Sequence, residues 1–166
     1  ADLCARHGLR RYGFHGLAHR AMWRRWRALA PGIVDGGRVI SIQLGAGCSM
    51  TAVDRGRVVD TSMGFSPLEG LVMATRSGDI DAGLLLYLAR ELGYDHAALD
   101  RLLTQESGLR GLSGSSGDMR ALVASDDARA RLAVAVYAYR ARKYVGAFLA
   151  EVSEFTKLGS GEYCTR

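Results

Sequence analysis

The sequence predicts an α/β protein in which a β-unit is followed by a mostly helical half. Two observations carry this prediction. β-branched residues are concentrated between Arg38 and Thr61, whereas apolar residues recur at helical spacing from Ile80 onward. The 166 residues suit one domain, and a hydrophobic fraction of 48% provides enough apolar side chains for a packed core.

The first half of the chain is predicted to contain one basic helix and the β-unit. The helix covers residues 17–29, and Pro31 and Gly32 follow it, because proline and glycine interrupt helical hydrogen bonding. The β-unit begins with the glycine-bounded run Arg-Val-Ile-Ser-Ile-Gln-Leu. Its first strand covers residues 38–44 and its second strand covers residues 49–53. A turn over residues 54–56 leads into a returning arm over residues 57–61.

The second half is predicted to be helical. Asp95 is placed as an N-cap, Asp126 or Asp127 can begin the last helix, and Gly93 stands where a helix-ending glycine belongs. The glycine- and serine-rich residues 107–117 are interpreted as a flexible connection. The helices are expected over residues 80–92, 95–104, 118–124 and about 126–152.

Charge and composition exclude several classes of function. The net charge of +5 suits either nucleic acid or phosphorylated small molecules, but aromatic residues do not interleave with the arginines as a nucleic-acid platform requires. No apolar run approaches the roughly 20 residues of a membrane span, and the first seven residues lack the basic-then-apolar order of a signal peptide. The three cysteines have no metal-ligand spacing. We therefore expect a cytoplasmic protein without nucleic-acid, membrane or zinc partners.

The segment Leu44-Gly-Ala-Gly-Cys-Ser49 is a candidate phosphate loop. Glycines allow the backbone to approach a phosphate and to direct N–H groups at it. It is not a Walker A loop, because no Lys-Ser or Lys-Thr pair follows and the next element is a strand. A tight turn between two strands explains the same residues equally well.

Two further side chains have the chemistry of anion binding. Arg76 stands among small residues before a predicted helix, where its planar guanidinium can meet an anionic group. His15 lies between an aromatic residue and a glycine; a buried histidine bonded to the backbone is the alternative. His19, one helical turn later, is interpreted as a surface or supporting residue. Asp79 and Asp81 are interpreted as helix caps in preference to magnesium ligands.

Four segments in order resemble the acetate kinase family, the short-chain carboxylate kinases. They are Arg10-Arg-Tyr-Gly-Phe-His-Gly16, the glycine loop, the run from Asp60 to Asp81, and Asp118-Met-Arg120. The resemblance implies that His15 and Arg76 act on the transferring phosphoryl group and that the glycine loop contacts ATP phosphates. It also implies that Asp118 and its neighbours contact adenosine, although Asp118 also suits a plain N-cap.

The resemblance includes departures from the family pattern. The family's phosphate segment reads His-Leu-Gly-Asn-Gly, whereas Gln43 and Ala46 replace its histidine and asparagine here. Residues 151–166 diverge from the family sequence and match the family's second nucleotide loop only in part. The candidate site consists of His15 and Arg76 as catalytic residues and Gln43, Leu44, Gly45, Ala46, Gly47, Asp118, Met119, Arg120, Gly159, Gly161 and Glu162 as nucleotide-binding residues, with no metal ligand.

The resemblance implies an incomplete ribonuclease-H-like domain of the actin-like ATPase superfamily. Residues 1–166 are expected to form a single partial domain, corresponding to most of the second of two kinase domains. The parent enzyme would convert ATP and acetate into ADP and acetyl phosphate, with Mg²⁺ held by residues outside this chain, and would form a homodimer. We expect the chain alone to be inactive. The alternative is an inactive nucleotide-binding or dimerisation module derived from the same family.

Overall fold

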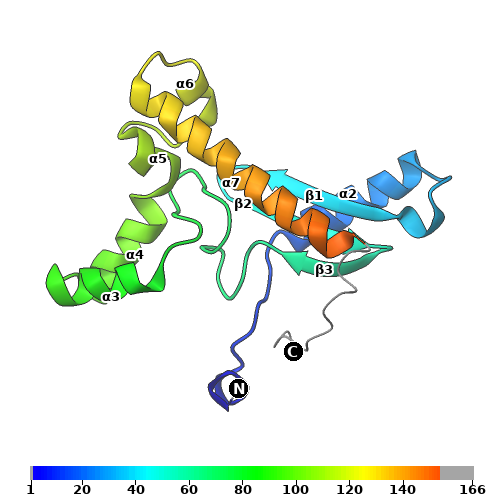
Figure 1. The fold of residues 1–166 in the computed structure, drawn as a ribbon, viewed down its shortest axis with the longest axis horizontal. Coiled ribbons are helices and arrows are strands. Elements are labelled where there is room, and N and C mark those ends of the chain that lie inside the picture. Colours follow the sequence, from blue (N-terminus) through cyan, green and yellow to red (C-terminus); the bar gives the residue numbers. More distant parts are fainter. Residues whose placement is uncertain (1, 154–166) are drawn as a thin grey trace. The chain divides into compact units, whose positions relative to one another are not determined.

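The computed structural model describes residues 2–153 and contains one sheet followed by a series of helices (Figure 1). The described chain forms two compact units. The first unit contains residues 2–43, 49–67 and 142–153, and the second contains residues 44–48 and 68–141. Within the described residues, no helix has both the length and the apolar character needed to cross a bilayer.

The first unit contains a three-stranded sheet in the order β1-β2-β3, formed by Arg38–Leu44, Cys48–Asp54 and Arg57–Thr61. The bounds predicted for the first strand and the returning arm are confirmed, and β2 is one residue longer at each end. β2 and β3 are antiparallel, with Thr51 opposite Thr61 and an irregularity between Ala52 and Val53. β2 is the central strand and is buried along almost its whole length, because it is covered by neighbours on both edges.

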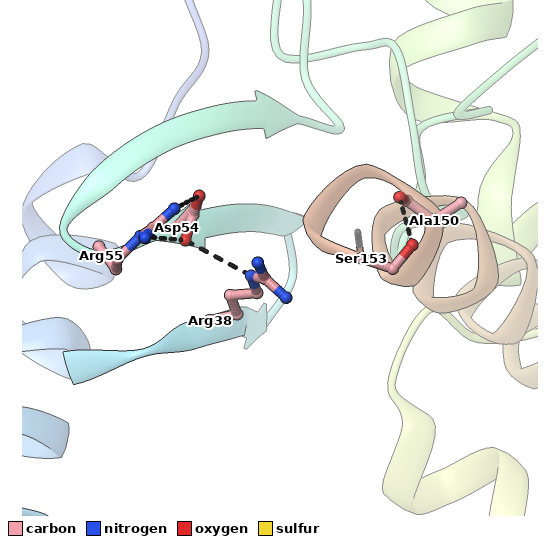
Figure 2. Close-up of polar contacts among 5 residues, drawn as sticks. All are labelled: Arg38, Asp54, Arg55, Ala150 and Ser153. Atoms are coloured by element: carbon pink, nitrogen blue, oxygen red, sulfur yellow. Dashed lines mark hydrogen bonds and ion pairs between the residues drawn. The ribbon is translucent and has the colours of Figure 1, made fainter. Parts of the chain in front are cut away.

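The predicted turn between β2 and β3 is a tight two-residue hairpin. Arg55 and Gly56 both have positive φ, 48° and 84°, which is the combination that matches the twist of a hairpin. Figure 2 shows Asp54 accepting from Arg55 Nε at 3.1 Å and pairing with Arg38 at 3.7 Å. The hydrogen bond from Arg55, together with the charges of both arginines, lowers the pKa of Asp54. These charges hold the turn that aligns β2 with β3.

Helix α2, Gly16–Leu29, confirms the predicted basic helix and is followed by the short helix η1, Val34–Gly36. Trp26 Nε1 donates to the carbonyl of Gly36 at 2.9 Å, and this bond holds η1 against α2. A Cβ at Gly36 would lie 2.5 Å from the Trp23 ring, so the tryptophan packing requires glycine there. A further short helix, α1 at Asp2–His7, was not predicted.

The second unit is built from helices that begin at aspartate caps. The side chains of Asp81, Asp95 and Asp118 each accept a backbone N–H at the start of a helix. Asp127, and not Asp126, caps the last helix through the amides of residues 129 and 130. The helices are α3 at Ala82–Glu91, α4 at His96–Gln105, α5 at Gly108–Ser113, α6 at Met119–Val123 and α7 at Ala128–Val152.

The last helix, α7, continues from the second unit into the first. Figure 2 shows its C-terminal end, where the Ser153 hydroxyl donates to the carbonyl of Ala150 at 2.9 Å. This bond satisfies one of the carbonyls that a helix end leaves without an intrahelical partner.

Two predictions for this half were wrong. Residues 107–117 are not merely a flexible connection, because α5 forms within them. Asp79 is not a helix cap: it accepts the backbone N–H of Gly70 at 2.8 Å and pairs with Arg140. The reason is the same in both cases, since backbone and side-chain partners far away in the sequence engage these residues.

The core of the second unit lies among α5, α6 and α7. Leu109 from α5, Leu122 from α6, and Ala130 and Ala133 from α7 are buried together with Val72. Residue 72 belongs to the irregular segment that also carries Arg76. The core therefore holds the Arg76 loop and the start of α6 in one unit.

Candidate functional site

The glycine loop is anchored from beneath by a buried cysteine. Cys48, which is fully buried, donates its thiol to the carbonyl of Gly45 at 3.2 Å and contacts the Tyr137 hydroxyl at 3.3 Å. Burial, followed by the hydrogen bond with Cys48, raises the pKa of Tyr137, so the Tyr137 hydroxyl keeps its proton at physiological pH. The N–H of Gly45 bonds to the carbonyl of Gly47 at 3.1 Å. The loop is thus a defined turn whose first two residues, Gly45 and Ala46, remain exposed.

Three of the segments that the sequence singled out meet at Ala74. Its N–H donates to the carbonyl of Ala46 in the glycine loop at 3.0 Å, and its carbonyl accepts from Arg110 at 3.0 Å. A Cβ at Gly117 would lie 2.7 Å from the same carbonyl, which places the residue before Asp118 in close backbone contact. Since Ala74 is two residues from Arg76, the glycine loop, the Arg76 loop and the Asp118 segment adjoin one another within the second unit.

The backbone of the Arg76 loop is held by the start of α5. The N–H groups of residues 107 and 109 donate to the carbonyls of Thr75 and Met73 at 3.0 and 2.9 Å. The loop closes on itself through the N–H of Met73 and the carbonyl of Arg76 at 3.3 Å. The half-buried Arg76 side chain lies with Nη1 3.7 Å from Met73 Sδ. The guanidinium therefore projects from a backbone that is fixed on both sides.

Asp118 serves as the N-cap of α6, as predicted, and also pairs with Arg120. Its carboxylate accepts the backbone N–H of Arg120 at 2.9 Å and the side-chain Nε and Nη2 at 3.2 and 2.9 Å. These hydrogen bonds lower the pKa of Asp118 and raise that of Arg120. Met119 packs against the core of the second unit. Any ligand that approaches Asp118 therefore meets a carboxylate that already shares its oxygens with a guanidinium.

His15 lies in the first unit, at the start of α2. It has a left-handed backbone, with φ 59°, which is uncommon for a residue other than glycine. Its Nδ1 lies 2.9 Å from Ser49 Oγ, and its ring is half-buried. Thus the histidine is bonded to a buried side chain and not to the backbone carbonyl that the alternative interpretation required.

His19 is buried, so its interpretation as a surface residue was wrong, and its interpretation as a supporting residue stays a prediction. Its Nε2 lies 2.8 Å from the same Ser49 hydroxyl, and its Nδ1 lies 2.9 Å from Ser41 Oγ. Sequence reasoning missed Ser41 and Ser49. The available signal was their position within two apolar strands, because a serine that falls on the covered face of a sheet needs a polar partner.

The burial of His19 gives a pH dependence to the stability of the chain. Burial, and then the nearby charge of His15, lower the pKa of His19 from its ordinary 6.5. Between the lowered value and 6.5 the unfolded chain binds more protons than the folded chain, so the free energy of unfolding should fall as the pH drops below 6.5. Urea denaturation between pH 8 and 5 should show a smaller fall in His19→Gln. A fall as large as that of the unmodified chain would contradict this, and His96→Gln, at an exposed histidine, is the control.

The remaining candidate residues are more dispersed. Gln43 and Leu44 lie at the end of β1, next to the glycine loop. Gly159, Gly161 and Glu162 lie outside the described residues. His15 and Gln43 belong to the first unit, whereas the glycine loop, Arg76 and Asp118 belong to the second. The convergence of His15 with the other segments stays a prediction.

Comparisons with known proteins identify relatives of this chain. The profile of the Acetokinase family matches residues 1–158. The acetate kinase of Chloroherpeton thalassium is 49% identical over 152 residues, which are 89% of this chain and 36% of that protein. The acetate kinase of Solibacter usitatus is 47% identical over 152 residues, which are 89% of this chain and 37% of that protein. The chain therefore spans somewhat more than a third of the length of these relatives.

Solved structures extend the similarity to the fold. The crystal structure of Porphyromonas gingivalis acetate kinase matches 92% of this chain and 39% of that one, with a TM-score of 0.87 and 41% identity. A propionate kinase from Francisella tularensis matches 90% of this chain and 39% of that one, with a TM-score of 0.84 and 36% identity. The predicted fold, part of a ribonuclease-H-like domain of the actin-like ATPase superfamily, is confirmed. Because the family profile, the relatives and the shared fold all agree, the chain belongs to the Acetokinase family.

Proposed function

We propose that this chain is part of a short-chain carboxylate kinase that transfers a phosphoryl group between ATP and a small carboxylic acid. With acetate, the whole enzyme would form ADP and acetyl phosphate. The observation that supports this most directly is the meeting of the glycine loop, the Arg76 loop and the Asp118 segment at Ala74. A nucleotide needs backbone donors at its phosphates and polar groups at its ribose, and these three segments supply both from one place.

The roles follow from the chemistry of each group. The backbone of Gly45–Gly47 would meet the phosphates, and Asp118–Arg120 would meet the adenosine. Arg76 offers a planar cation to an anionic oxygen, and His15 offers a ring nitrogen. Phosphoryl transfer is catalysed mainly by positioning and by stabilising charge on the equatorial oxygens, so fixed cationic and hydrogen-bonding groups suffice without a covalent intermediate.

Within the described residues, no group of three or more histidine, cysteine, aspartate or glutamate side chains is placed to hold a metal ion. Asp79 is engaged by Gly70 and Arg140, and Asp81 caps α3. If the enzyme uses Mg²⁺ with its nucleotide, we infer that the protein ligands of the ion come from outside the described residues.

The proposal also names partners and a location. The ligands are a nucleotide and a small carboxylate or acyl phosphate, and the enzyme would work in the cytoplasm, where ATP is available. A homodimer of the parent enzyme is supported by α3, which has no buried residue and exposes Leu84, Leu86 and Tyr87. Where such apolar side chains form a contiguous patch, the patch is typical of a surface that associates with another protein.

One observation favours a second candidate, an inactive nucleotide-binding or dimerisation module. Gln43 and Ala46 stand beside the glycine loop without the histidine and asparagine of the family segment. Ala46 has no side-chain donor for a phosphate, and Gln43 can still donate through its amide but without the charge that a histidine can carry. Formation of acetyl phosphate from ATP and acetate by the enzyme separates the two candidates, because a binding module would show none.

Restoring the histidine and the asparagine of the family segment should strengthen nucleotide binding. In Gln43→His with Ala46→Asn, we expect ATP to bind at least about fivefold more tightly, since one hydrogen bond contributes roughly 1 kcal/mol. Isothermal titration calorimetry measures the change. The matched control is Gln105→His with Ala97→Asn, which makes the same replacements at exposed positions of α4. Unchanged or weaker binding in the first variant would show that these positions do not face the phosphates.

A further inference from the structure

Five side chains in the first unit form a continuous series of hydrogen bonds that begins at His15 and ends at Met22. His15 Nδ1 contacts Ser49 Oγ at 2.9 Å, and the same oxygen contacts His19 Nε2 at 2.8 Å. His19 Nδ1 contacts Ser41 Oγ at 2.9 Å, and Ser41 lies 3.6 Å from Met22 Sδ. Ser49 is fully buried, and Ser41 and His19 are each 6% exposed. Water therefore cannot substitute freely for any of the three inner members.

The Met22 end of this hydrogen-bond series determines which atom donates in each bond. A methionine sulfur carries no hydrogen and can only accept, so the Ser41 hydroxyl donates to Met22. The Ser41 oxygen is then left to accept, which requires a hydrogen on His19 Nδ1. A neutral imidazole carries one hydrogen, so Nε2 of a neutral His19 is an acceptor.

The same reasoning assigns the donor and the acceptor in the bond between Ser49 and His15. Burial and the charge of His15 both lower the pKa of His19, which keeps the His19 ring neutral. Ser49 must donate to His19 Nε2, and its oxygen accepts from His15 Nδ1. Each serine donates once and accepts once, so the arrangement leaves no buried polar atom of these side chains without a partner.

This arrangement determines which atom His15 can offer to a ligand. With Nδ1–H committed to Ser49, Nε2 has no hydrogen-bond partner among the described residues. In a doubly protonated His15 ring the second hydrogen lies on Nε2, which can then donate to an acceptor. The backbone supports the placement, because the carbonyl of His15 accepts from the N–H of residue 19 at 3.0 Å.

We propose that Ser49, His19 and Ser41 are positioning residues that hold His15 with Nδ1–H bonded to Ser49, so that Nε2 is the atom that meets a phosphoryl oxygen, to which it donates when the ring carries its second proton. The second clause rests on the proposed carboxylate kinase function. The first concerns only the geometry of the first unit. None of the three positioning residues would itself touch the substrate. Their effect is to remove the choice of tautomer and of ring orientation before the ligand arrives, and such preorganisation is what electrostatic stabilisation requires.

The test is the tautomer itself, measured in the full chain without a nucleotide. The chain is labelled with ¹⁵N-histidine, and two-bond ¹H–¹⁵N correlation spectra are recorded at about pH 8, above the ordinary histidine pKa of about 6.5. We expect His15 and His19 each to show a protonated Nδ1 and a bare Nε2. The exposed His7 and His96 report averaged tautomers in the same spectrum. An averaged ring or a protonated Nε2 at His15 overturns the proposal, and this spectrum needs no variant to fold.

A pair of variants separates positioning from stability. Ser49→Ala removes the bridge, and His15 should then show the averaged tautomers of an exposed histidine. The matched control is Ser62→Ala, which removes another buried hydroxyl of the same unit, one that accepts from the N–H of Met50 at 2.9 Å. It should leave the His15 tautomer unchanged. A fixed His15 tautomer in Ser49→Ala would show that the serine does not set it.

Adding acetyl phosphate distinguishes the two clauses. A change at His15 Nε2, with Nδ1 still protonated, supports the whole proposal. A fixed tautomer with no change at Nε2 at saturating acetyl phosphate refutes the phosphoryl contact and counts against the carboxylate kinase function, while the positioning by Ser49 stands. A change at an unfixed ring would instead refute the positioning and leave the proposed function supported.

Discussion

Replacing Gly108 with alanine is expected to lower the free energy of unfolding by about 3 kcal/mol or more, through strain and overpacking together. Gly108 has φ +64°, and an added Cβ would lie 2.3 Å from the carbonyl oxygen of Met73 and 2.8 Å from that of Arg76. Neither oxygen belongs to a flexible side chain. The Met73 carbonyl already accepts from the N–H of Leu109 at 2.9 Å, so it cannot move away without losing that bond.

The matched control for this substitution is Gly93→Ala. Gly93 has nearly the same backbone, with φ +69°, but an added Cβ would find nothing within 4 Å. Its cost should be only that of a left-handed alanine, about 1 kcal/mol. Urea denaturation of both variants measures the difference. Equal losses would show that the Arg76 loop yields to the new methyl group. Under the proposed function, Gly108→Ala should also weaken ATP binding, because the loop that carries Arg76 must shift.

Truncating Leu122 to alanine is expected to destabilise the chain by about 2–5 kcal/mol, the range for a large-to-small change in a core. Leu122 is 2% exposed and is the one buried residue of α6, where it packs in the core of the second unit. A five-residue helix cannot be stable by itself, so this contact holds it in place. The segment Asp118–Arg120 would lose its support together with the helix.

The adjacent residue provides the control for this change. Val123 lies in the same helix but is 67% exposed. Val123→Ala should change the free energy of unfolding by less than about 0.5 kcal/mol, because it removes little buried surface. The two variants are compared by urea denaturation. A loss below about 1 kcal/mol in Leu122→Ala would mean that α6 is held by something other than its leucine.

Local signals were sufficient for most of the elements. β1 and β3 were predicted with their observed bounds, because β-branched residues bounded by glycine specify a strand without reference to distant contacts. The caps at Asp95 and Asp118 were predicted for a similar reason, since a capping side chain bonds to the amides of its own helix. The motifs that mark the family are also continuous segments, so the sequence alone predicted the family, and the comparisons confirmed it.

Elements that depend on distant partners were predicted less well. The glycines of residues 107–117 suggested a flexible connection. However, the backbone of residues 73–76 lies against Gly108 and Gly117 and leaves no room for a side chain at either position. A sequence does not distinguish a glycine that permits bending from one that permits close approach. The same applies to Asp79, whose partner Arg140 is 61 residues away.

By itself, the sequence determined the three strands, the helices α2, α3, α4, α6 and α7, and the family to which the chain belongs. The tertiary structure decided that the glycine loop, the Arg76 loop and the Asp118 segment adjoin at Ala74, and that His19 is buried and bonded to Ser49. The physical reason is range. Propensity, periodicity and capping act within a few residues, whereas burial and the choice of hydrogen-bond partner depend on segments that only the folded chain brings together.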